Sequence, residues 1–189
     1  MSAHGFEHHG DRTVHHGHVW KVVAGSFTGP DGEPFERDVV RSPGAVATVP
    51  IRDVDGAPWV VLVRQYRAAF DDLVIEVPAG MRDIEGEAIE ATAERELVEE
   101  AGYRAGHLEH LVDFYPSTGM TDSVLHVFLA TDLVAVERAW HGVEEQHMEV
   151  LELPLAETLA MIDRGAIHDA KTIIGLLLAE RHLGAHAEG

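Results

Sequence analysis

The sequence predicts a mixed α/β (α+β) fold in which β-sheets are covered by α-helices. Strand-like apolar segments lie on both sides of one charged helical segment, and two further helical segments close the chain. This order of elements is typical of a mixed sheet with helices packed on it. Apolar residues make up 46% of the 189 residues, which is enough for a sizeable core and excludes a globally disordered chain.

The composition limits the partners and the compartment. Fourteen Lys and Arg against 33 Asp and Glu give a formal net charge of −19, which disfavours nucleic acid and anionic membranes as partners. A small anionic substrate remains compatible if metal ions and a few arginines reverse the potential locally. Without cysteine there is no disulfide framework, and the N-terminus shows no apolar signal segment. We therefore expect a cytoplasmic protein.

The N-terminal part is expected to form two regions. Six of the 14 histidines lie within residues 1–18, and their irregular spacing favours a disordered His-rich tail over a metal-binding one. Residues 19–41 follow as a small β unit, because "HVWKVVAGSF" and "PFERDVVRS" are separated by the turn sequence "GPDGEP". Residues 42–189 form the main domain, and the N-terminal strand unit is a candidate for exchange across a dimer.

The main domain follows from local patterns. Strands are expected at Gly44–Ile51 and Pro58–Tyr66, joined at Asp55-Gly56, and a short strand "LVIEVP" ends at Pro78. A helix should run from near Glu87 to Gly102, since glycine commonly ends helices. The later elements are three strands and two helices: "LEHLVDFY", "SVLHVFLATDL", "MEVLELP", Leu155–Arg164 and Asp169–His182, with Asp169 as N-cap.

The helix before Gly102 carries stacked carboxylates. At about 100° per residue, Glu96, Glu99 and Glu100 fall on one face and the apolar residues on the other. Arg95 is placed to pair with Glu99 one turn later. Such a face is either a solvated acidic surface or a cation site. The tight loop at Gly80 favours a cation site, because a loop carbonyl and carboxylates form the all-oxygen shell that Mg²⁺ or Mn²⁺ prefers.

Gly80, Glu87 and "RELVEEAGY" (Arg95 to Tyr103) resemble the Nudix box of hydrolases that act on nucleoside diphosphates linked to another moiety. The resemblance implies a Nudix fold, with mixed β-sheets sandwiched by α-helices. Six residues separate Gly80 from Glu87 where the family usually has five, so Glu85 is an alternative for the role of Glu87. The extra loop residue leaves the helix register intact.

The resemblance also implies the roles of the box residues. Glu96 and Glu100 would bind the divalent cation, Mg²⁺ with Mn²⁺ as a possible substitute. Glu99 would assist them, and the backbone carbonyl of Ala79 would lie beside them. Arg95 would orient the cluster by ion pairing.

Motifs outside the box resemble the ADP-ribose pyrophosphatase branch. These are "SPGAVATVPI", "VLVRQYR", "IEVPAG", "YPSTGMTD" and "GAIHDAKTIIGLLL". The branch implies hydrolysis of ADP-ribose to AMP and ribose 5-phosphate. The alternatives are another nucleoside diphosphate sugar, such as GDP-mannose or an ADP- or UDP-hexose, and a non-catalytic nucleotide-binding module. The retained box glutamates disfavour the last.

The substrate-binding candidates come from the strands and the loop around the box. Arg64 and Arg67 point to opposite faces of a strand, and the resemblance favours Arg67, with Arg41 as a second candidate. Glu76 would support the metal site, the alternative being an exposed charge on an edge strand. The loop residues Tyr115, Ser117 and Met120 are candidates to close over the terminal ribose.

Two further roles are expected outside these strands. In "WHGVEEQHMEV", Glu144 is the expected general base, and Glu145 is the alternative. Trp20, Phe27 and Phe35 either stack on adenine or fill a small core of their own. The branch often shares this N-terminal unit across a homodimer, so a homodimer is expected.

Overall fold

The computed structural model describes residues 4–138 and 146–187 and divides into two compact units. Unit 1 comprises Met1–Gly44 and Tyr115–Val124, and unit 2 comprises Ala45–Phe114 and Leu125–Gly189. The segment Tyr115–Val124 is held in unit 1 by hydrogen bonds to the backbone of Val40. The Val40 amide donates to the Met120 carbonyl at 2.8 Å, and the Thr121 hydroxyl donates to the Val40 carbonyl at 2.8 Å.

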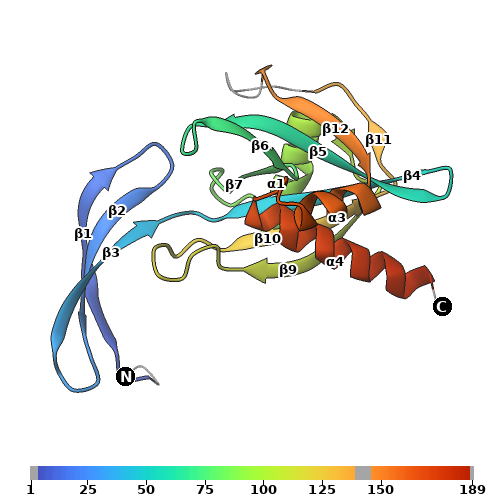
Figure 1. The fold of residues 1–189 in the computed structure, drawn as a ribbon. Coiled ribbons are helices and arrows are strands. Elements are labelled where there is room, and N and C mark those ends of the chain that lie inside the picture. The colour runs from blue at the N-terminus through green and yellow to red at the C-terminus, as the bar shows by residue number, and fades with distance from the viewer. Residues whose placement is uncertain (1–3, 139–145, 188–189) are drawn as a thin grey trace. The chain divides into compact units, whose positions relative to one another are not determined.

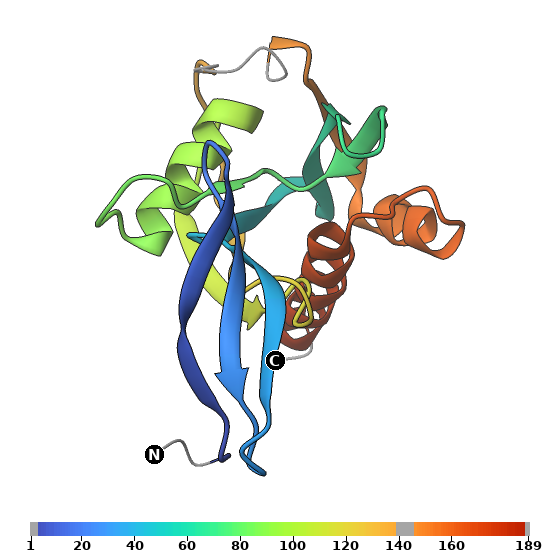
Figure 2. The same ribbon diagram turned by 90° about the vertical axis from the view of Figure 1, so that its left-hand side faces the viewer.

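Unit 1 is built on a three-stranded antiparallel sheet in the order β1-β2-β3 (Figure 2). Its strands are β1 (Glu7–His16), β2 (Lys21–Thr28) and β3 (Pro34–Arg41). The expected β2 and β3 are present. Strand β1 differs from the disordered tail expected for residues 1–18. All ten of its residues are exposed, so the ladder to β2 supports it rather than burial, and hydrophobic periodicity gives no sign of such a strand.

Unit 2 contains a seven-stranded mixed sheet with the main order β12-β5-β4-β10-β9. β10 runs parallel to β4, whereas the other pairs are antiparallel; β6 pairs with β5, and β7 with β4. The strands of unit 2 are β4 (Ala45–Val54), β5 (Ala57–Arg67), β6 (Asp72–Glu76), β7 (Ala79–Met81), β8 (Tyr103–Arg104), β9 (His107–Phe114), β10 (Leu125–Thr131), β11 (Val134–Ala135) and β12 (Glu149–Pro154). The expected longer strands are all present.

The helices pack on both faces of this sheet, as Figures 1 and 2 show. Strand alternation sends Ala47 and Val127 toward α3 (Leu155–Asp163) and α4 (Ala170–Ala187), where they join the main core with Leu176. The neighbouring Val46 and Phe128 face the opposite way and pack against α1 (Ile89–Glu96) through Ala93. The predicted layering of helices on a mixed sheet is therefore confirmed.

Two helix ends lie where the sequence predicted them, but the backbone of one helix is irregular. Asp169 caps α4 as predicted, because its carboxylate accepts the Thr172 amide at 2.9 Å. Gly102 ends the box helix in the left-handed region (φ 73°), also as predicted. Between Glu96 and Gly102, however, the chain forms a π-helical segment, η1 (Leu97–Ala101), in place of a regular α-helix.

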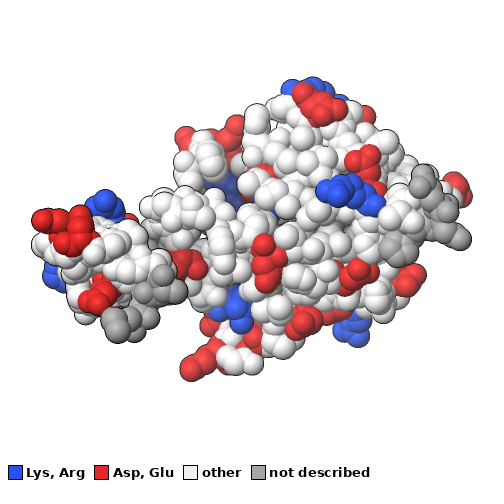
Figure 3. Space-filling view, turned by 90° about the horizontal axis from the view of Figure 1, so that it is seen from below, with Lys and Arg blue, Asp and Glu red and all other residues white. Residues whose placement is uncertain are grey.

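The surface agrees with the acidic composition. On the face drawn in Figure 3, acidic side chains are spread widely while basic ones form a few isolated groups. Among the described residues, no helix is both long and apolar enough to cross a membrane.

Candidate functional site

Strand β7 brings a stretch of backbone against the carboxylates of the box helix. The Ala79 amide donates a 2.8 Å hydrogen bond to Oε2 of Glu100. The Glu96 carboxyl lies directly over Gly80, where a Cβ atom would come within 1.9 Å of its Cδ atom. A larger residue at position 80 would therefore push the Glu96 carboxyl out of its present place.

The change from α1 to η1 falls at the carboxylates. Glu96 ends α1, and Glu99 and Glu100 lie within η1, where each turn contains an additional residue. Glu100 is only 6% exposed and contacts Ala79, while the Glu96 carboxyl lies against the next residue, Gly80, so the two side chains meet β7 at adjacent positions. Single π-helical turns occur frequently at functional sites.

Arg95 organises the outer part of the cluster. Its guanidinium donates to Glu96 at 2.7 Å, to Glu99 at 3.2 Å and to Glu87 at 3.2 Å. The predicted ion pair with Glu99 is therefore present. Glu87, rather than the exposed Glu85, is the loop carboxylate that Arg95 holds. One cation thus fixes three carboxylates around the start and end of α1.

The surroundings of Glu96 and Glu100 raise the pKa of both carboxyl groups. Burial is the main cause that raises the pKa of Glu100 to about 8; the hydrogen bond from the Ala79 amide lowers the pKa, and the charge of Glu96 raises it by a smaller amount. Burial likewise raises the pKa of Glu96 to about 7, against the opposing charge of Arg95. Two buried carboxylates that resist ionisation side by side fit a site built for a divalent cation, whose charge would favour the ionised form.

We expect the metal-free protein to lose stability as the pH rises from about 5 to about 8. In the unfolded chain these glutamates ionise near a pKa of 4.5, whereas in the fold they retain protons to about 7 and about 8. The folded state then binds more protons, so its stability is greatest below the unfolded pKa and is lost as the pH rises through the folded values. Thermal unfolding in a chelating buffer measures this, and Mg²⁺ should stabilise the protein more at pH 8 than at pH 6. A melting temperature that rises over this pH interval in Glu100→Gln and wild type alike would contradict the assignment.

A second buried network lies beside the first. Glu76 is only 3% exposed, which rules out the exposed edge charge that the sequence left open. It accepts two hydrogen bonds from Arg67, at 2.8 and 2.6 Å, and one from Lys171 at 2.6 Å. Burial raises the pKa of Glu76, but these two cations outweigh it and leave the pKa below its usual value. The charges of Arg67 and Lys171 also act on Glu100, so both networks belong to one site.

Lys171 was not identified from the sequence. It is the second residue of α4, where the positive end of the helix dipole opposes a cation, and its side chain is only 12% exposed. Glu76 and Asp169, at 2.6 and 3.0 Å, offset that cost. A lysine in the first turn of a helix is unusual and could have marked this residue in the sequence. Its partner Glu76, however, is 95 residues earlier in the chain, so the pairing could not be predicted.

The two arginines of β5 are separated as strand alternation predicted. Arg67 turns to Glu76, whereas Arg64 makes an exposed ion pair with Glu149 of β12 at 2.6 Å. Arg64 therefore matches the alternative of a surface ion pair, and only Arg67 contacts the buried network.

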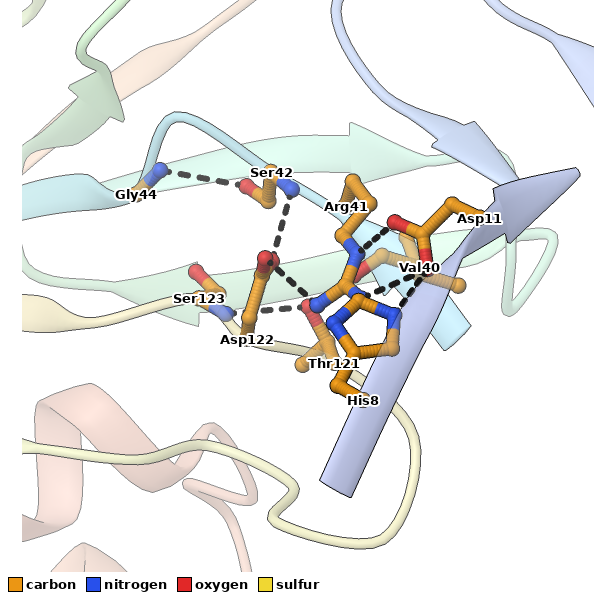
Figure 4. Close-up of polar contacts among 9 residues, drawn as sticks. All are labelled: His8, Asp11, Val40, Arg41, Ser42, Gly44, Thr121, Asp122 and Ser123. Atoms are coloured by element: carbon orange, nitrogen blue, oxygen red, sulfur yellow. Dashed lines mark hydrogen bonds and ion pairs between the residues drawn. The ribbon is translucent and has the colours of Figure 1, made fainter. Parts of the chain in front are cut away.

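The other predicted arginine, Arg41, lies within unit 1 (Figure 4). Its guanidinium donates to Asp11 at 2.8 and 3.0 Å and to Asp122 at 3.2 Å, and the Ser42 amide also donates to Asp122, at 2.9 Å. These bonds tie β1 and the segment Tyr115–Val124 to the end of β3. That segment carries the three candidate loop residues, of which Tyr115 and Met120 are exposed and Ser117 is half-buried.

The aromatic candidates of unit 1 lie at opposite ends of its sheet. Trp20 is 47% exposed and lines a hollow of about 310 Å³ with Lys21, Arg41 and Ser42. Phe35 stacks on Phe27 at the far ends of β2 and β3, with ring centroids 5.3 Å apart. Phe35 therefore fits the alternative of a small aromatic core, whereas Trp20 lines a hollow. The proposed bases Glu144 and Glu145 lie outside the described residues.

The chain is similar to known hydrolases that act on nucleoside diphosphate compounds. Residues 42–174 match the NUDIX domain family. The chain is 38% identical over 143 residues to an ADP-ribose pyrophosphatase of Bacillus subtilis (strain 168), covering 76% of this chain and 75% of the relative. It is 36% identical over 166 residues to a GDP-mannose pyrophosphatase of Cronobacter sakazakii, covering 82% and 84%. A crystal structure described as an ADP compounds hydrolase has the same fold, with a TM-score of 0.82 over 98% of both chains at 21% identity.

Proposed function

Because the chain belongs to the NUDIX domain family, we propose that it hydrolyses the diphosphate of ADP-ribose to AMP and ribose 5-phosphate with Mg²⁺. One observation carries this proposal: the half-buried Glu96 and the buried Glu100 lie together against the backbone of β7 with raised pKa values. The relatives named ADP-ribose and GDP-mannose pyrophosphatases support a nucleoside diphosphate sugar as the substrate class. A purely nucleotide-binding module would not require this cluster.

The metal ligands are proposed from the oxygen atoms that lie together at the end of α1, in η1 and in β7. Glu96 and Glu100 would hold the cation, with Glu99 assisting and the Ala79 carbonyl beside them. All of these donors are oxygens, which suits Mg²⁺ or Mn²⁺. When bound, the cation neutralises the diphosphate and lowers the pKa of a water molecule. Arg95 keeps Glu96 and Glu99 in place through its 2.7 and 3.2 Å hydrogen bonds.

Arg67 is proposed to bind the diphosphate. Its Nε and Nη2 groups donate to Glu76, which leaves Nη1 as the donor for a phosphate oxygen. Glu76 acts as the orienting group, since a buried carboxylate holds the planar guanidinium in one position. Lys171 donates to the same Oε2 atom of Glu76 as Nη2 of Arg67, and its charge helps to keep that carboxylate ionised.

The nucleoside is proposed to bind in unit 1. Trp20 offers an exposed ring for stacking on adenine, next to the cations Lys21 and Arg41. Tyr115, Ser117 and Met120 are the proposed contacts of the terminal ribose. We further propose a cytoplasmic homodimer in which the strands of unit 1 contribute to association, for which light scattering is the direct measurement.

The attacking water is proposed to be activated by Glu144. Glu144→Gln should lower kcat by roughly 10²- to 10⁴-fold, the usual contribution of a general base. KM should change little, because the carboxylate would contact the water and not the nucleotide. Steady-state kinetics of Glu144→Gln and Glu145→Gln measures this. A large loss at Glu145 alone would move the role by one residue, and small losses at both would leave water activation to the box carboxylates and the metal.

The substrate is tested with a panel of nucleoside diphosphate sugars. Values of kcat/KM with Mg²⁺ for ADP-ribose, GDP-mannose, ADP-glucose and UDP-glucose should be highest for ADP-ribose by about tenfold or more, equivalent to ~1.4 kcal/mol in the transition state. A tenfold preference for GDP-mannose would select the alternative instead. No turnover of any of the four would contradict a hydrolase of this class.

A further inference from the structure

Two histidines and one aspartate form a cluster on unit 2 that the proposed hydrolysis does not use. The Nε2 atom of His110 lies 2.6 Å from Oδ1 of Asp113, and Nδ1 of His126 lies 2.7 Å from the same oxygen. The ligand atoms of all three side chains lie within 4.8 Å of one another. Such a convergence of imidazole and carboxylate donors is typical of sites for transition metals.

A β-bulge places these residues on one side of the sheet. In the ladder between β9 and β10, Asp113 pairs with His126 and Val112 with Val127, but Phe128 pairs with His110, so Leu111 is an additional residue. Alternation alone would send residues 110 and 113 to opposite faces. Because Leu111 and Val112 both pack toward the helical core, His110 and Asp113 emerge together on the other face.

The cluster is separate from the box carboxylates. His126 pairs with Val46 of β4, and Val46 pairs in turn with Gly80 of β7, over which Glu96 lies. Two strand spacings, about 10 Å, therefore separate His126 from Gly80. The apolar side chains of Val46, Ala93 and Phe128 pack together in one buried cluster on the face between them.

We propose that His110, Asp113 and His126 bind a divalent transition cation of the Zn²⁺ class. Two imidazoles and one carboxylate suit Zn²⁺, Co²⁺ or Ni²⁺, whereas Mg²⁺ prefers oxygen ligands alone. Zinc binds nitrogen and oxygen at about 2.0–2.2 Å in tetrahedral geometry, which sets its ligand atoms about 3.4 Å apart, so the present contacts need to open by roughly 0.7 Å to admit the ion. The cation ties the edge strand β9 to β10.

Burial differs among the three ligands in a way that suits entry of an ion. His110 and Asp113 are 45% and 50% exposed, and His126 is 12% exposed. The His110 ring is held edge-on to the buried Phe128, with centroids 5.5 Å apart. The Nε2 atom of His126 has no hydrogen-bond partner within the described parts of the chain, and loss of such support typically weakens metal affinity about 10- to 100-fold. We therefore expect modest affinity.

The test is calorimetric titration of the full chain with ZnCl₂ in saturating Mg²⁺, which occupies the box carboxylates. Wild type should show one Zn²⁺-binding event that is absent in His110→Gln and Asp113→Asn. If the event persists in these variants, its dissociation constant should be at least about tenfold lower in wild type. His107→Gln is the matched control, since His107 lies on the same strand, is 63% exposed and is outside the cluster. The histidines of residues 4–18 are identical in all four proteins and cancel in the comparison.

A second readout is independent of stoichiometry. Co²⁺ in a site with nitrogen ligands absorbs visible light, and this absorbance should be lost in His110→Gln and Asp113→Asn but kept in His107→Gln. The rate of hydrolysis with Mg²⁺ should be unchanged in His110→Gln. A result that contradicts the transition-metal site would therefore leave the proposed hydrolase function untouched. Equal Zn²⁺ isotherms in wild type and both cluster variants, or binding by the N-terminal histidines only, would overturn the proposal. Both substituted residues are exposed, so circular dichroism should show native folding.

Discussion

Glu100→Gln is expected to lower turnover with Mg²⁺ by at least about a hundredfold, a loss of ~2.7 kcal/mol in transition-state stabilisation. Glu100 is 6% exposed and accepts the Ala79 amide, so an amide of the same shape can occupy its place. The change removes the carboxylate charge but keeps most of the packing. Steady-state kinetics with ADP-ribose and Mg²⁺ measures the loss.

Glu90→Gln is the matched control for this prediction. Glu90 is exposed and lies in the first turn of α1, which continues directly into the η1 segment that carries Glu100. Its substitution removes an equal charge but should leave turnover within about twofold of wild type. If Glu100→Gln folds and retains more than about a tenth of the activity, Glu100 is not a metal ligand. Mg²⁺ should also raise the melting temperature of wild type more than that of Glu100→Gln.

Gly80→Ala is expected to have an effect of similar size for a steric reason. The added Cβ would lie 1.9 Å from Cδ of Glu96, so the Glu96 carboxyl has to move away. The atom in the way is the end of a side chain, and the fold should therefore survive while the cation site is distorted. We expect kcat/KM to fall about a hundredfold and the Mg²⁺ concentration for half-maximal rate to rise.

Gly184→Ala provides the comparison for Gly80→Ala. Gly184 lies in α4, where an added Cβ would meet no atom of another described element within 4 Å, and alanine favours a helix. Its activity should equal that of wild type, with unchanged or slightly higher thermal stability. Normal activity and normal Mg²⁺ dependence in Gly80→Ala would show that Glu96 has no fixed role.

Local patterns predicted the parts of the site that are close in sequence. The spacing of Arg95, Glu96, Glu99 and Glu100 placed their side chains together because one helical turn brings such residues onto one face. The resemblance to the Nudix box, now confirmed by the family match, depended on the same short segment. The strands and the caps at Gly102 and Asp169 were predictable for the same reason.

The remaining parts depend on contacts between distant residues. Lys171 contacts Glu76 although the two residues are 95 positions apart, and no local sequence pattern indicates that they pair. Strand β1 buries none of its side chains, so no apolar periodicity marks it. The π-helical turn depends on a change of backbone hydrogen-bond partners, and the bulge at Leu111 depends on how two strands pair. Helical-wheel and alternation arguments assume regular elements and fail at such irregular positions.

Glu96 and Glu100 are proposed to bind the cation with which this chain splits the diphosphate of ADP-ribose. Phosphorus NMR of ADP-ribose incubated with the protein tests this proposal most directly. With Mg²⁺, the diphosphate signals should disappear and two phosphomonoester signals, those of AMP and ribose 5-phosphate, should appear together in equal amounts. With chelator, or with Glu100→Gln and Mg²⁺, the diphosphate should persist on the same time scale. An unchanged diphosphate in the presence of wild type and Mg²⁺, or equal cleavage in chelator, would contradict the account.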